Sequence, residues 1–224
     1  MFSFQLPLDQ LTGSHMHRDR IKSKESSGGD SAYGRIVAAA RRTFFMNGFR
    51  RVTMDDLAHE LGMSKKTLYE HFPSKTALVE AAIGDQFQSI DTELERITLE
   101  CSSDFAGAAQ RLIAYIQRQM GEIQPPFWRD IRRQPEMFSH MESRRRELVQ
   151  RYFGRLMGEG RKAGIIREDV PVELITEIIL AALDKIMNPT KMAELELTPK
   201  AGFSAIISVI FRGVITEKGR LQMR

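Results

Sequence analysis

The sequence predicts an all-α protein, and three observations support this prediction. Apolar residues recur at helical spacing along most of the chain from residue 31 onward, and no segment alternates apolar and polar residues as a half-buried strand would. Prolines and capping residues mark the boundaries of these periodic segments. No internal repeat of roughly 20–50 residues is visible, which argues against a solenoid. We therefore expect packed helical domains.

The composition limits the domain organisation and the compartment. The chain has 224 residues, of which 42% are hydrophobic, and this suits one small domain joined to a larger one. The longest uninterrupted apolar run is Ile178 to Leu183, whereas a membrane-spanning helix needs roughly 20 residues. Cys101 is the only cysteine, which excludes an intrachain disulfide and a multi-cysteine zinc site. Because no secretory signal is recognisable either, we expect a cytoplasmic protein that does not enter a membrane.

Residues 1–30 are expected to form a flexible N-terminal arm. Serine and glycine pairs occupy positions 26–29, and helical periodicity is absent. The tetrapeptide at 13–16 resembles a remnant of an expression vector, so residues 1–16 are left out of the fold prediction. Four basic residues between 18 and 24 fit a solvated tail better than a nucleic-acid contact.

Three short helices are expected next, over residues 31–47, 54–61 and 65–72. Thr53 precedes the second helix, and together with Asp56 it resembles a capping box. Gly62 ends that helix, and Ser64 caps the third. Pro73 stops the third helix, so these three helices would form a compact unit, which we predict to span residues 31–76.

The rest of the chain is predicted to form a larger helical domain over residues 77–218. Its periodic segments, the first of which begins just before that boundary, cover residues 75–99, 105–123, 142–163, 172–187 and 199–216. Pro125-Pro126 is expected to close the second of these segments with a kink, and Gly164 to end the third.

A helix, a short turn at Gly62 and a second helix form the layout of a helix-turn-helix. Leu68 and Phe72 lie four residues apart and are expected to face inward against Leu57 and Leu61. The remaining side chains of the third helix would then be exposed, and they are Lys65, Lys66, Thr67, Tyr69, Glu70 and His71. Lysine, threonine, tyrosine and histidine suit phosphates and base edges, and residues 15–75 carry 12 Lys+Arg against 7 Asp+Glu. The pattern favours nucleic acid as a partner.

The segment from Gly48 to Ala58, followed by Gly62 to Lys75, resembles the DNA-binding domain of the TetR family of regulators. The family pattern places a threonine before the second helix, Ser-Lys at the start of the third, then a tyrosine and Phe-x-x-Lys, and each of these is present here. The match covers about residues 33–80. Beyond that block the resemblance is one of architecture only.

The resemblance implies DNA contacts at eight positions: Thr53, Ser64, Lys65, Lys66, Thr67, Tyr69, His71 and Lys75. Lys66 and Thr67 occupy the positions that most often read bases, and many family members have glycine in place of Lys66. Lys75 would hold a phosphate at the start of the following helix. For His71 a surface role without contact is equally open, and Glu70 would either accept from a cytosine or face solvent.

The last two long helices carry apolar residues on a shared face: Ile175, Ile178, Ile179, Ala182, Ile186, Phe203, Ile206, Ile207, Ile210 and Val214. Both helices have further apolar residues outside this face, so they need cover on both sides. The resemblance implies that a second copy supplies it, through a four-helix dimer interface. Asp184 and Lys185 would then form a salt bridge across the twofold axis or a solvated rim.

The resemblance implies a cavity for a small molecule among the middle helices. Its candidate lining residues are Phe105, Tyr115, Met120, Phe127, Trp128, Met137, Phe138 and Met141, although such side chains also build ordinary cores. A second set would either meet an anionic head group or form a solvated face, and it comprises Arg118, Arg129, Arg132 and Arg133.

These patterns together predict a ligand-responsive DNA-binding transcriptional regulator. The expected form is a repressor that binds a double-stranded, pseudo-palindromic operator as a homodimer and is released by a hydrophobic or amphipathic small-molecule effector. No cofactor, metal site or catalytic set is predicted, because Cys101 has no neighbouring histidine and no HExxH, Walker or GxSxG motif occurs. The alternatives are a helical protein-interaction module and a regulator whose DNA binding is activated by its ligand.

Overall fold

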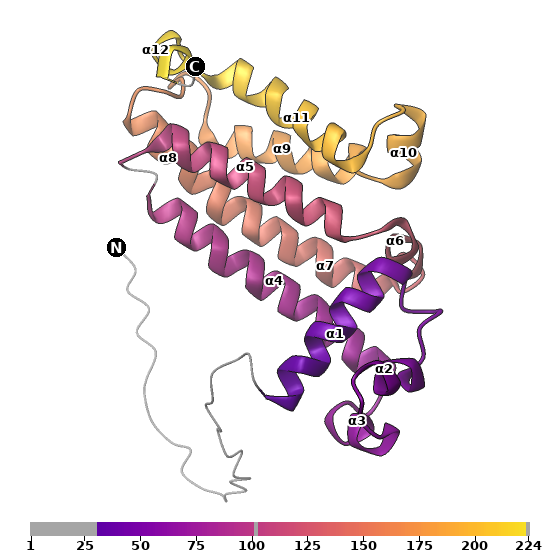
Figure 1. Cartoon of the computed structure of the whole chain (residues 1–224). Coiled ribbons are helices and arrows are strands. Elements are labelled where there is room, and N and C mark those ends of the chain that lie inside the picture. Colours follow the sequence, from indigo (N-terminus) through magenta and orange to yellow (C-terminus); the bar gives the residue numbers. More distant parts are fainter. Residues whose placement is uncertain (1–30, 101–102, 223–224) are drawn as a thin grey trace, which may run out of the picture.

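The computed structural model describes residues 31–100 and 103–222, and this part of the chain is built from helices (Figure 1). The predicted N-terminal arm and Cys101 lie outside the described residues. The α-helices are α1 (Ala32–Asn47), α2 (Met54–Glu60), α3 (Lys65–His71), α4 (Lys75–Leu99), α5 (Phe105–Glu122), α6 (Pro125–Ile131), α7 (Pro135–Leu148), α8 (Gly154–Lys162), α9 (Val172–Ile186), α10 (Pro189–Glu194), α11 (Pro199–Val214) and α12 (Glu217–Gln222). A π-helical turn, η1 (Val149–Phe153), joins α7 to α8.

The all-α prediction is confirmed, and the first three helices begin where their caps predict. Thr53 forms the predicted capping box, because its side chain accepts from the Asp56 N–H at 3.1 Å and its own N–H donates to Asp56 Oδ2 at 2.8 Å. Ser64 accepts from the Thr67 N–H at 3.0 Å at the start of α3. Each cap satisfies a backbone group that the first turn of a helix leaves unpaired.

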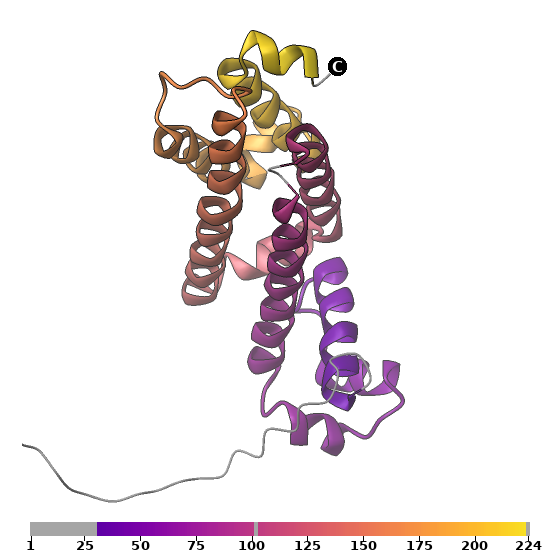
Figure 2. The ribbon, with the colours of Figure 1, turned by 90° about the vertical axis from the view of Figure 1, so that its left-hand side faces the viewer.

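The helices α1–α3 and the first half of α4 enclose one hydrophobic core at one end of the elongated molecule (Figure 2). Leu57 and Leu68 are fully buried in it, which fixes α2 and α3 against α1. Phe127 and Ile131 of α6 also belong to this core. The first unit is therefore completed by residues well beyond 76, and the predicted boundary at 76 remains a prediction.

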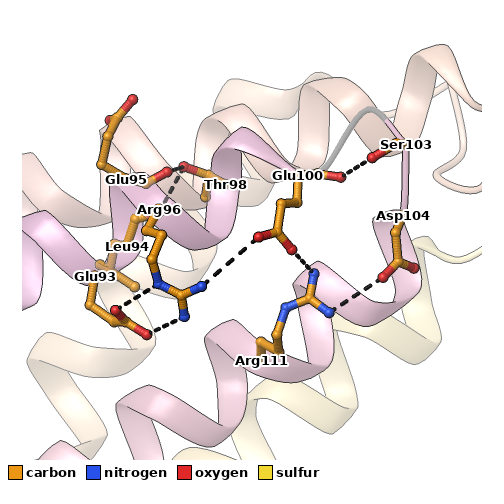
Figure 3. A network of polar contacts seen from close by, with 9 residues as sticks. All are labelled: Glu93, Leu94, Glu95, Arg96, Thr98, Glu100, Ser103, Asp104 and Arg111. Atoms are coloured by element: carbon orange, nitrogen blue, oxygen red, sulfur yellow. Dashed lines mark hydrogen bonds and ion pairs between the residues drawn. The ribbon is translucent and has the colours of Figure 1, made fainter.

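The helix α4 belongs to both parts of the molecule. Leu78 and Ala82 pack in the first core, whereas Leu94 and Ile97 pack in a second core formed with α5, η1, α8, α9 and α11. At the far end of α4 an ion-pair network joins it to α5 (Figure 3). Arg111 contacts Glu100 at 2.7 Å and Asp104 at 3.4 Å across that turn. One rigid rod thus connects the two cores.

Several boundaries differ from the prediction, and proline explains most of the differences. The helix expected from residue 142 begins at Pro135, and α6 and α10 were not predicted at all. Pro125, Pro135 and Pro189 each stand in the first turn of a helix, where the missing N–H costs nothing. The expectation of a kink at Pro125-Pro126 treated proline as a terminator only, which is why these helices were missed. The short helix α12 was also missed.

Two chain segments pair briefly at the end of the molecule opposite α2 and α3. Arg167 N–H donates to Val214 O at 2.9 Å and Thr216 N–H donates to Ile165 O at 2.8 Å. This isolated bridge between Ile166 and Ile215 is the only β pairing in the part of the chain that the structure describes. Across the described ranges, no helix combines the length and the apolar character needed to cross a membrane.

Candidate nucleic-acid interface and ligand cavity

The α2–α3 pair has the geometry of a helix-turn-helix at the free end of the molecule (Figure 1). Gly62 adopts φ of 64° in the turn, a left-handed conformation that glycine takes at little cost. The Met63 N–H donates to Ala58 O at 3.0 Å and closes the turn. The sequence therefore positions α3 by a glycine-dependent turn and by the buried side chain of Leu68.

The outer surface of α3 is polar. Leu68 and Phe72 point into the core as predicted, with exposed fractions of 0% and 3%. Thr67 is half-buried, and the exposed side chains are Lys65, Lys66, Tyr69, Glu70 and His71. A helix that turns hydrogen-bond donors outward, at the end of the molecule farthest from the second core, suits the major groove of DNA.

Five of the predicted contact residues have partners within the chain: Ser64 and Thr67 are hydrogen-bonded to each other, and Thr53, Lys65 and Lys75 have other partners. Lys65 Nζ lies 2.9 Å from Asp55 Oδ1, and this carboxylate raises the pKa of the lysine. Lys75 Nζ donates to Val52 O at 3.1 Å and thereby holds the turn between α1 and α2. Hydrogen bonds from Thr53 lower the pKa of Asp56 in the capping box. Lys75 thus supports the turn that precedes Thr53, whatever else its amino group contacts.

A cavity of about 210 Å³ lies between α4, α5, α7, η1, α9 and α11. Four of the eight predicted residues line it, namely Met120, Trp128, Phe138 and Met141. The other four lie elsewhere: Phe105 and Tyr115 are buried in the second core, Phe127 in the first, and Met137 lines two other hollows. Those four were predicted from residue type alone, which does not distinguish a core side chain from a cavity wall.

Most of the cavity wall was not predicted, because it comes from segments far apart in the sequence. The remaining lining residues are Phe45, Ile83, Gln86, Phe87, Ile90, Leu94, Leu112, Ile116, Gln119, Ile123, Glu142, Arg145, Leu148, Val149, Tyr152, Phe153, Ile179, Leu183, Met187, Phe203 and Ile207. Three of them belong to the π-turn η1, a distortion that is often found at functional sites. The five-residue π-turn has no sequence signature that we recognise.

Polar side chains interrupt the apolar wall at three points. Gln86 is 4% exposed, and its Nε2 donates to Gln119 Oε1 at 2.5 Å. At another point Arg145 contacts Glu142 at 3.0 Å and also pairs with Asp184. Tyr152 donates its hydroxyl to Asp91 Oδ1 at 2.7 Å, and burial raises the pKa of this phenol. The amide pair offers a ligand one hydrogen-bonding position in largely apolar surroundings.

Comparison with known proteins identifies the first unit. The sequence model for bacterial regulatory proteins of the tetR family matches residues 36–82, which comprise most of α1, all of α2 and α3 and the start of α4. The N-terminal domain belongs to the TetR family. The surface of α3 described above is therefore the outer surface of the second helix of a TetR helix-turn-helix.

Related sequences also match this chain, but only over part of their length. The transcriptional regulator EthR of Mycolicibacterium smegmatis is 27% identical over 110 residues, which is 49% of this chain and 51% of EthR. The regulator YvaF of Bacillus subtilis is 44% identical over 69 residues, 31% of this chain and 35% of YvaF. The matched segments thus span about half or less of these relatives. Both relatives are named as HTH-type transcriptional regulators, not as enzymes.

A solved structure shares the fold over nearly the whole chain. SmeT, the repressor of the Stenotrophomonas maltophilia multidrug efflux pump SmeDEF, aligns with a TM-score of 0.60 and 17% identity, over 85% of this chain and 94% of SmeT. A second structure of SmeT is a complex with triclosan. At this identity the likeness shows that the TetR domain here is joined to a helical domain of the same architecture.

Most residues of the predicted dimer face are buried within the chain itself, and the dimer interface stays a prediction. Seven of the ten are buried in the chain's own second core: Ile175, Ile179, Phe203, Ile206, Ile207, Ile210 and Val214. Ala182 and Ile186 pack against the same core, and only Ile178 is exposed. A helix that is apolar around much of its circumference gives two candidate faces, and the sequence pattern does not say which one the chain covers itself.

The predicted roles of the charged residues in this domain also need correction. Asp184 pairs with Arg145 and Arg146 of its own chain, so it is not free for a bridge across a twofold axis. Lys185 is exposed. None of the four arginines predicted to meet an anionic head group lines the cavity; Arg118 lies over the ring of Tyr115 and Arg132 over that of Phe138. Arg129 and Arg133 line a separate hollow.

Proposed function

We propose that this chain is a ligand-responsive transcriptional regulator that binds a pseudo-palindromic DNA operator as a homodimer and is released by a small apolar or amphipathic molecule. One observation carries the proposal: a TetR helix-turn-helix presents the polar surface of α3 at a free end of the molecule, while its apolar side is anchored by Leu68. The sequence units 31–76 and 77–218 would then be the DNA-binding domain and the ligand-binding and dimerisation domain.

The polar residues in and next to α3 are proposed to make two kinds of contact, to bases and to phosphates. Lys66 and Thr67 are the proposed base readers, because the N-terminal residues of this helix enter the groove first. Ser64, Lys65, Tyr69 and His71 would contact the phosphate backbone from the same helix. Thr53 adds a phosphate contact from the start of α2. Lys75 would do so from α4 while its amino group also holds Val52 O.

The cavity supports a small-molecule effector. Its wall is almost entirely apolar; the amide pair of Gln86 and Gln119 is a neutral polar point, and the charged Glu142 and Arg145 are paired with each other. The complex of SmeT with triclosan provides a precedent for a small-molecule ligand on this architecture. The effector class that we propose is therefore a mainly apolar molecule carrying one neutral hydrogen-bonding group.

The connection between the two sites runs through α4. Ile83, Gln86 and Ile90 of α4 line the cavity, and the same helix begins at Lys75 directly after α3. A ligand that binds more tightly when α4 is displaced would shift the population toward dimers whose α3 helices are wrongly spaced for DNA. Half-sites on one side of the duplex lie roughly 34–36 Å apart, so a small displacement is sufficient.

The dimer interface is proposed on the exposed apolar residues of α9 and α11. Leu174 and Ile178 of α9 are 50% and 48% exposed, and Val209 of α11 is 73% exposed. We expect Val209→Glu to produce a monomer in sedimentation velocity. Leu99→Glu is the matched control, because Leu99 is 68% exposed on α4 away from this face. A Val209→Glu protein that remains a dimer would place the interface elsewhere.

The decisive experiment is selection of binding sites from random DNA with the full chain. A pseudo-palindrome should be enriched. Lys66→Ala should lower the preference at one base position by about 1–3 kcal/mol, whereas Lys200→Ala, an exposed lysine outside the TetR domain, should have no effect. If no sequence is enriched with or without an added apolar ligand, the chain is a helical interaction module instead. Enrichment only with ligand present would identify a ligand-activated regulator.

A further inference from the structure

A second hollow, of about 280 Å³, lies at the junction of the TetR domain and the helical domain. Four arginines line it. Arg50 and Arg51 come from the turn between α1 and α2, and Arg129 and Arg133 come from α6 and the turn that follows it. The helices α1 and α6 pack against each other at this point (Figure 1). The hollow is therefore built by two segments about 80 residues apart in the sequence.

The arginines of this hollow have no acidic partner. Within residues 31–100 and 103–222, no carboxylate lies within 4 Å of any of the four guanidinium groups, whereas Arg111, Arg145 and Arg155, among others, form ion pairs. Four like charges around one hollow repel one another, and a concave surface concentrates their field. All four side chains are exposed, so water and salt screen much of this repulsion, but the concentrated positive charge attracts an anion.

The one carboxylate of the hollow serves the backbone. Asp130 Oδ2 accepts from the Arg50 N–H at 2.8 Å. It also lies against Gly48, where a Cβ atom would stand only 2.6 Å from it. Gly48 has φ of 77°, so both its conformation and the close approach require glycine. Asp130 thus connects α6 to the α1–α2 turn through this hydrogen bond. The guanidinium groups of the four arginines remain available to an anion from solution.

We propose that this hollow binds an anion that carries phosphate groups. Arginine presents paired N–H donors in a planar fork that matches phosphate oxygens, and guanidinium groups from two segments can grip one anion together. Arg50 and Arg51 belong to the TetR domain, while Arg129 and Arg133 belong to the segment that follows α5. A bound phosphate group would therefore contact both domains and stabilise the junction between them.

The phosphate has two possible sources, a free phosphorylated molecule and the DNA backbone. Figure 1 shows that the α6 end of α1 lies away from α3, the helix proposed to enter the groove. Arg51, however, lies only two residues before Thr53, the proposed phosphate contact at the start of α2, so experiment has to distinguish the two sources. Because the arginines alone recognise the anion, its binding is independent of whether α3 reads DNA.

The primary test measures thermal unfolding of the full chain with pyrophosphate in a phosphate-free buffer, with sodium chloride added to match ionic strength. At ten times the dissociation constant, bound pyrophosphate should raise Tm by about 3–5 °C relative to chloride. The double variant Arg129→Gln/Arg133→Gln should lose this shift. Arg118→Gln/Arg212→Gln, which removes two arginines outside the hollow, should keep it.

A second readout separates binding from a merely structural role. Without anion, Arg129→Gln/Arg133→Gln should have a Tm equal to or above that of the wild type, because repulsion is relieved. Arg129→Lys/Arg133→Lys keeps the charge but loses the fork, so pyrophosphate should bind several-fold more weakly. A glutamine variant that is less stable without anion would mean that these side chains support the fold, and would overturn the proposal.

The source of the phosphate is decided by the salt dependence of binding to a mixed-sequence DNA duplex. If DNA supplies it, the glutamine variant should reduce the slope of log affinity against log salt by about one per phosphate lost, relative to the control. If a free molecule supplies it, the slope is unchanged and only the pyrophosphate response disappears. No Tm shift with wild type, or a shift that survives in the glutamine variant, excludes the site.

Discussion

The two cores of this chain are packed in different ways. The first core, around Leu57 and Leu68, is filled by side chains from α1–α4 and α6. A cavity of about 210 Å³ is lined mainly by residues of the second core, and Phe45, Ile83 and Met141 of the first core complete its wall. A DNA-reading helix needs a rigid base, whereas an effector site needs space and elements that can shift. The difference in packing thus follows the difference in proposed task.

The helix starts show the same contrast. Ser31, Thr53, Ser64 and Ser74 each accept a hydrogen bond from the first turn of the helix that they precede in the first unit. In the second domain α5, α10 and α11 also have a side-chain cap, whereas α6, α7 and α9 begin without one. Local chemistry therefore sets the ends of the DNA-reading helices, and tertiary packing sets several of the others.

The largest expected effect is the loss of a core side chain from the filled core. Leu68→Ala should cost about 2–5 kcal/mol of unfolding free energy, because a fully buried side chain leaves a new cavity. Ile90→Ala should cost only about 1–2 kcal/mol, since this half-buried residue already borders a void. Urea denaturation of both variants measures the difference. Equal losses would show that the second core is as tightly packed as the first.

Filling the cavity should have the opposite sign. Ile116→Phe enlarges a residue of the cavity wall and should raise stability by about 0.5–2 kcal/mol while abolishing binding of the apolar fluorophore N-phenyl-1-naphthylamine. Ile113→Phe, nearly one helical turn earlier on α5, packs against the core outside the cavity and should destabilise the protein by about 1–3 kcal/mol. Fluorophore binding that survives in Ile116→Phe would mean that the dye occupies another site.

The sequence was more informative about the first unit than about the second, for a physical reason. The caps, the glycine turn and the buried Leu68 all act within a few residues, so their pattern predicts the position of α3. The cavity depends on which sides of α4, α9 and α11 meet, and this is a long-range property. Aromatic and methionine content therefore selected both Trp128, which lines the cavity, and its neighbour Phe127, which is buried in the first core.

A capping threonine in each domain tests whether stability and DNA binding can be separated. Thr53 and Thr198 accept from the N–H groups of Asp56 and Ala201 at 3.1 and 3.2 Å. Replacing either by alanine should cost about 1 kcal/mol of stability. Only Thr53→Ala should also weaken DNA binding, measured by fluorescence anisotropy on the selected operator. Thr53→Ser keeps a capping hydroxyl and should restore both properties; loss of DNA affinity in Thr198→Ala would mean that the effect is only general destabilisation.

The smallest effect concerns acid titration of two exposed aspartates, one in each domain. Hydrogen bonds from Thr53 lower the pKa of Asp56, whereas a hydrogen bond and ion pair with Arg167 lower the pKa of Asp169. A carboxylate whose pKa is depressed in the folded state contributes stability above its unfolded pKa, near 3.8, and that contribution disappears as pH falls through the folded pKa. Both contributions should therefore begin to fall below about pH 4 and be lost once the pH is below each folded-state pKa.

Salt distinguishes the two aspartates. The charge interaction of Asp169 with Arg167 is screened by salt, while the neutral donors of Thr53 are not. In NMR titrations of the side-chain carboxyl carbons, raising the salt concentration should move the pKa of Asp169 back toward 3.8 and leave that of Asp56 low. Equal salt dependence would mean that long-range charge, rather than the capping box, holds Asp56 ionised. The start of the DNA-reading unit would then depend on the electrostatics of its whole surface, and its local sequence would no longer be sufficient to explain it.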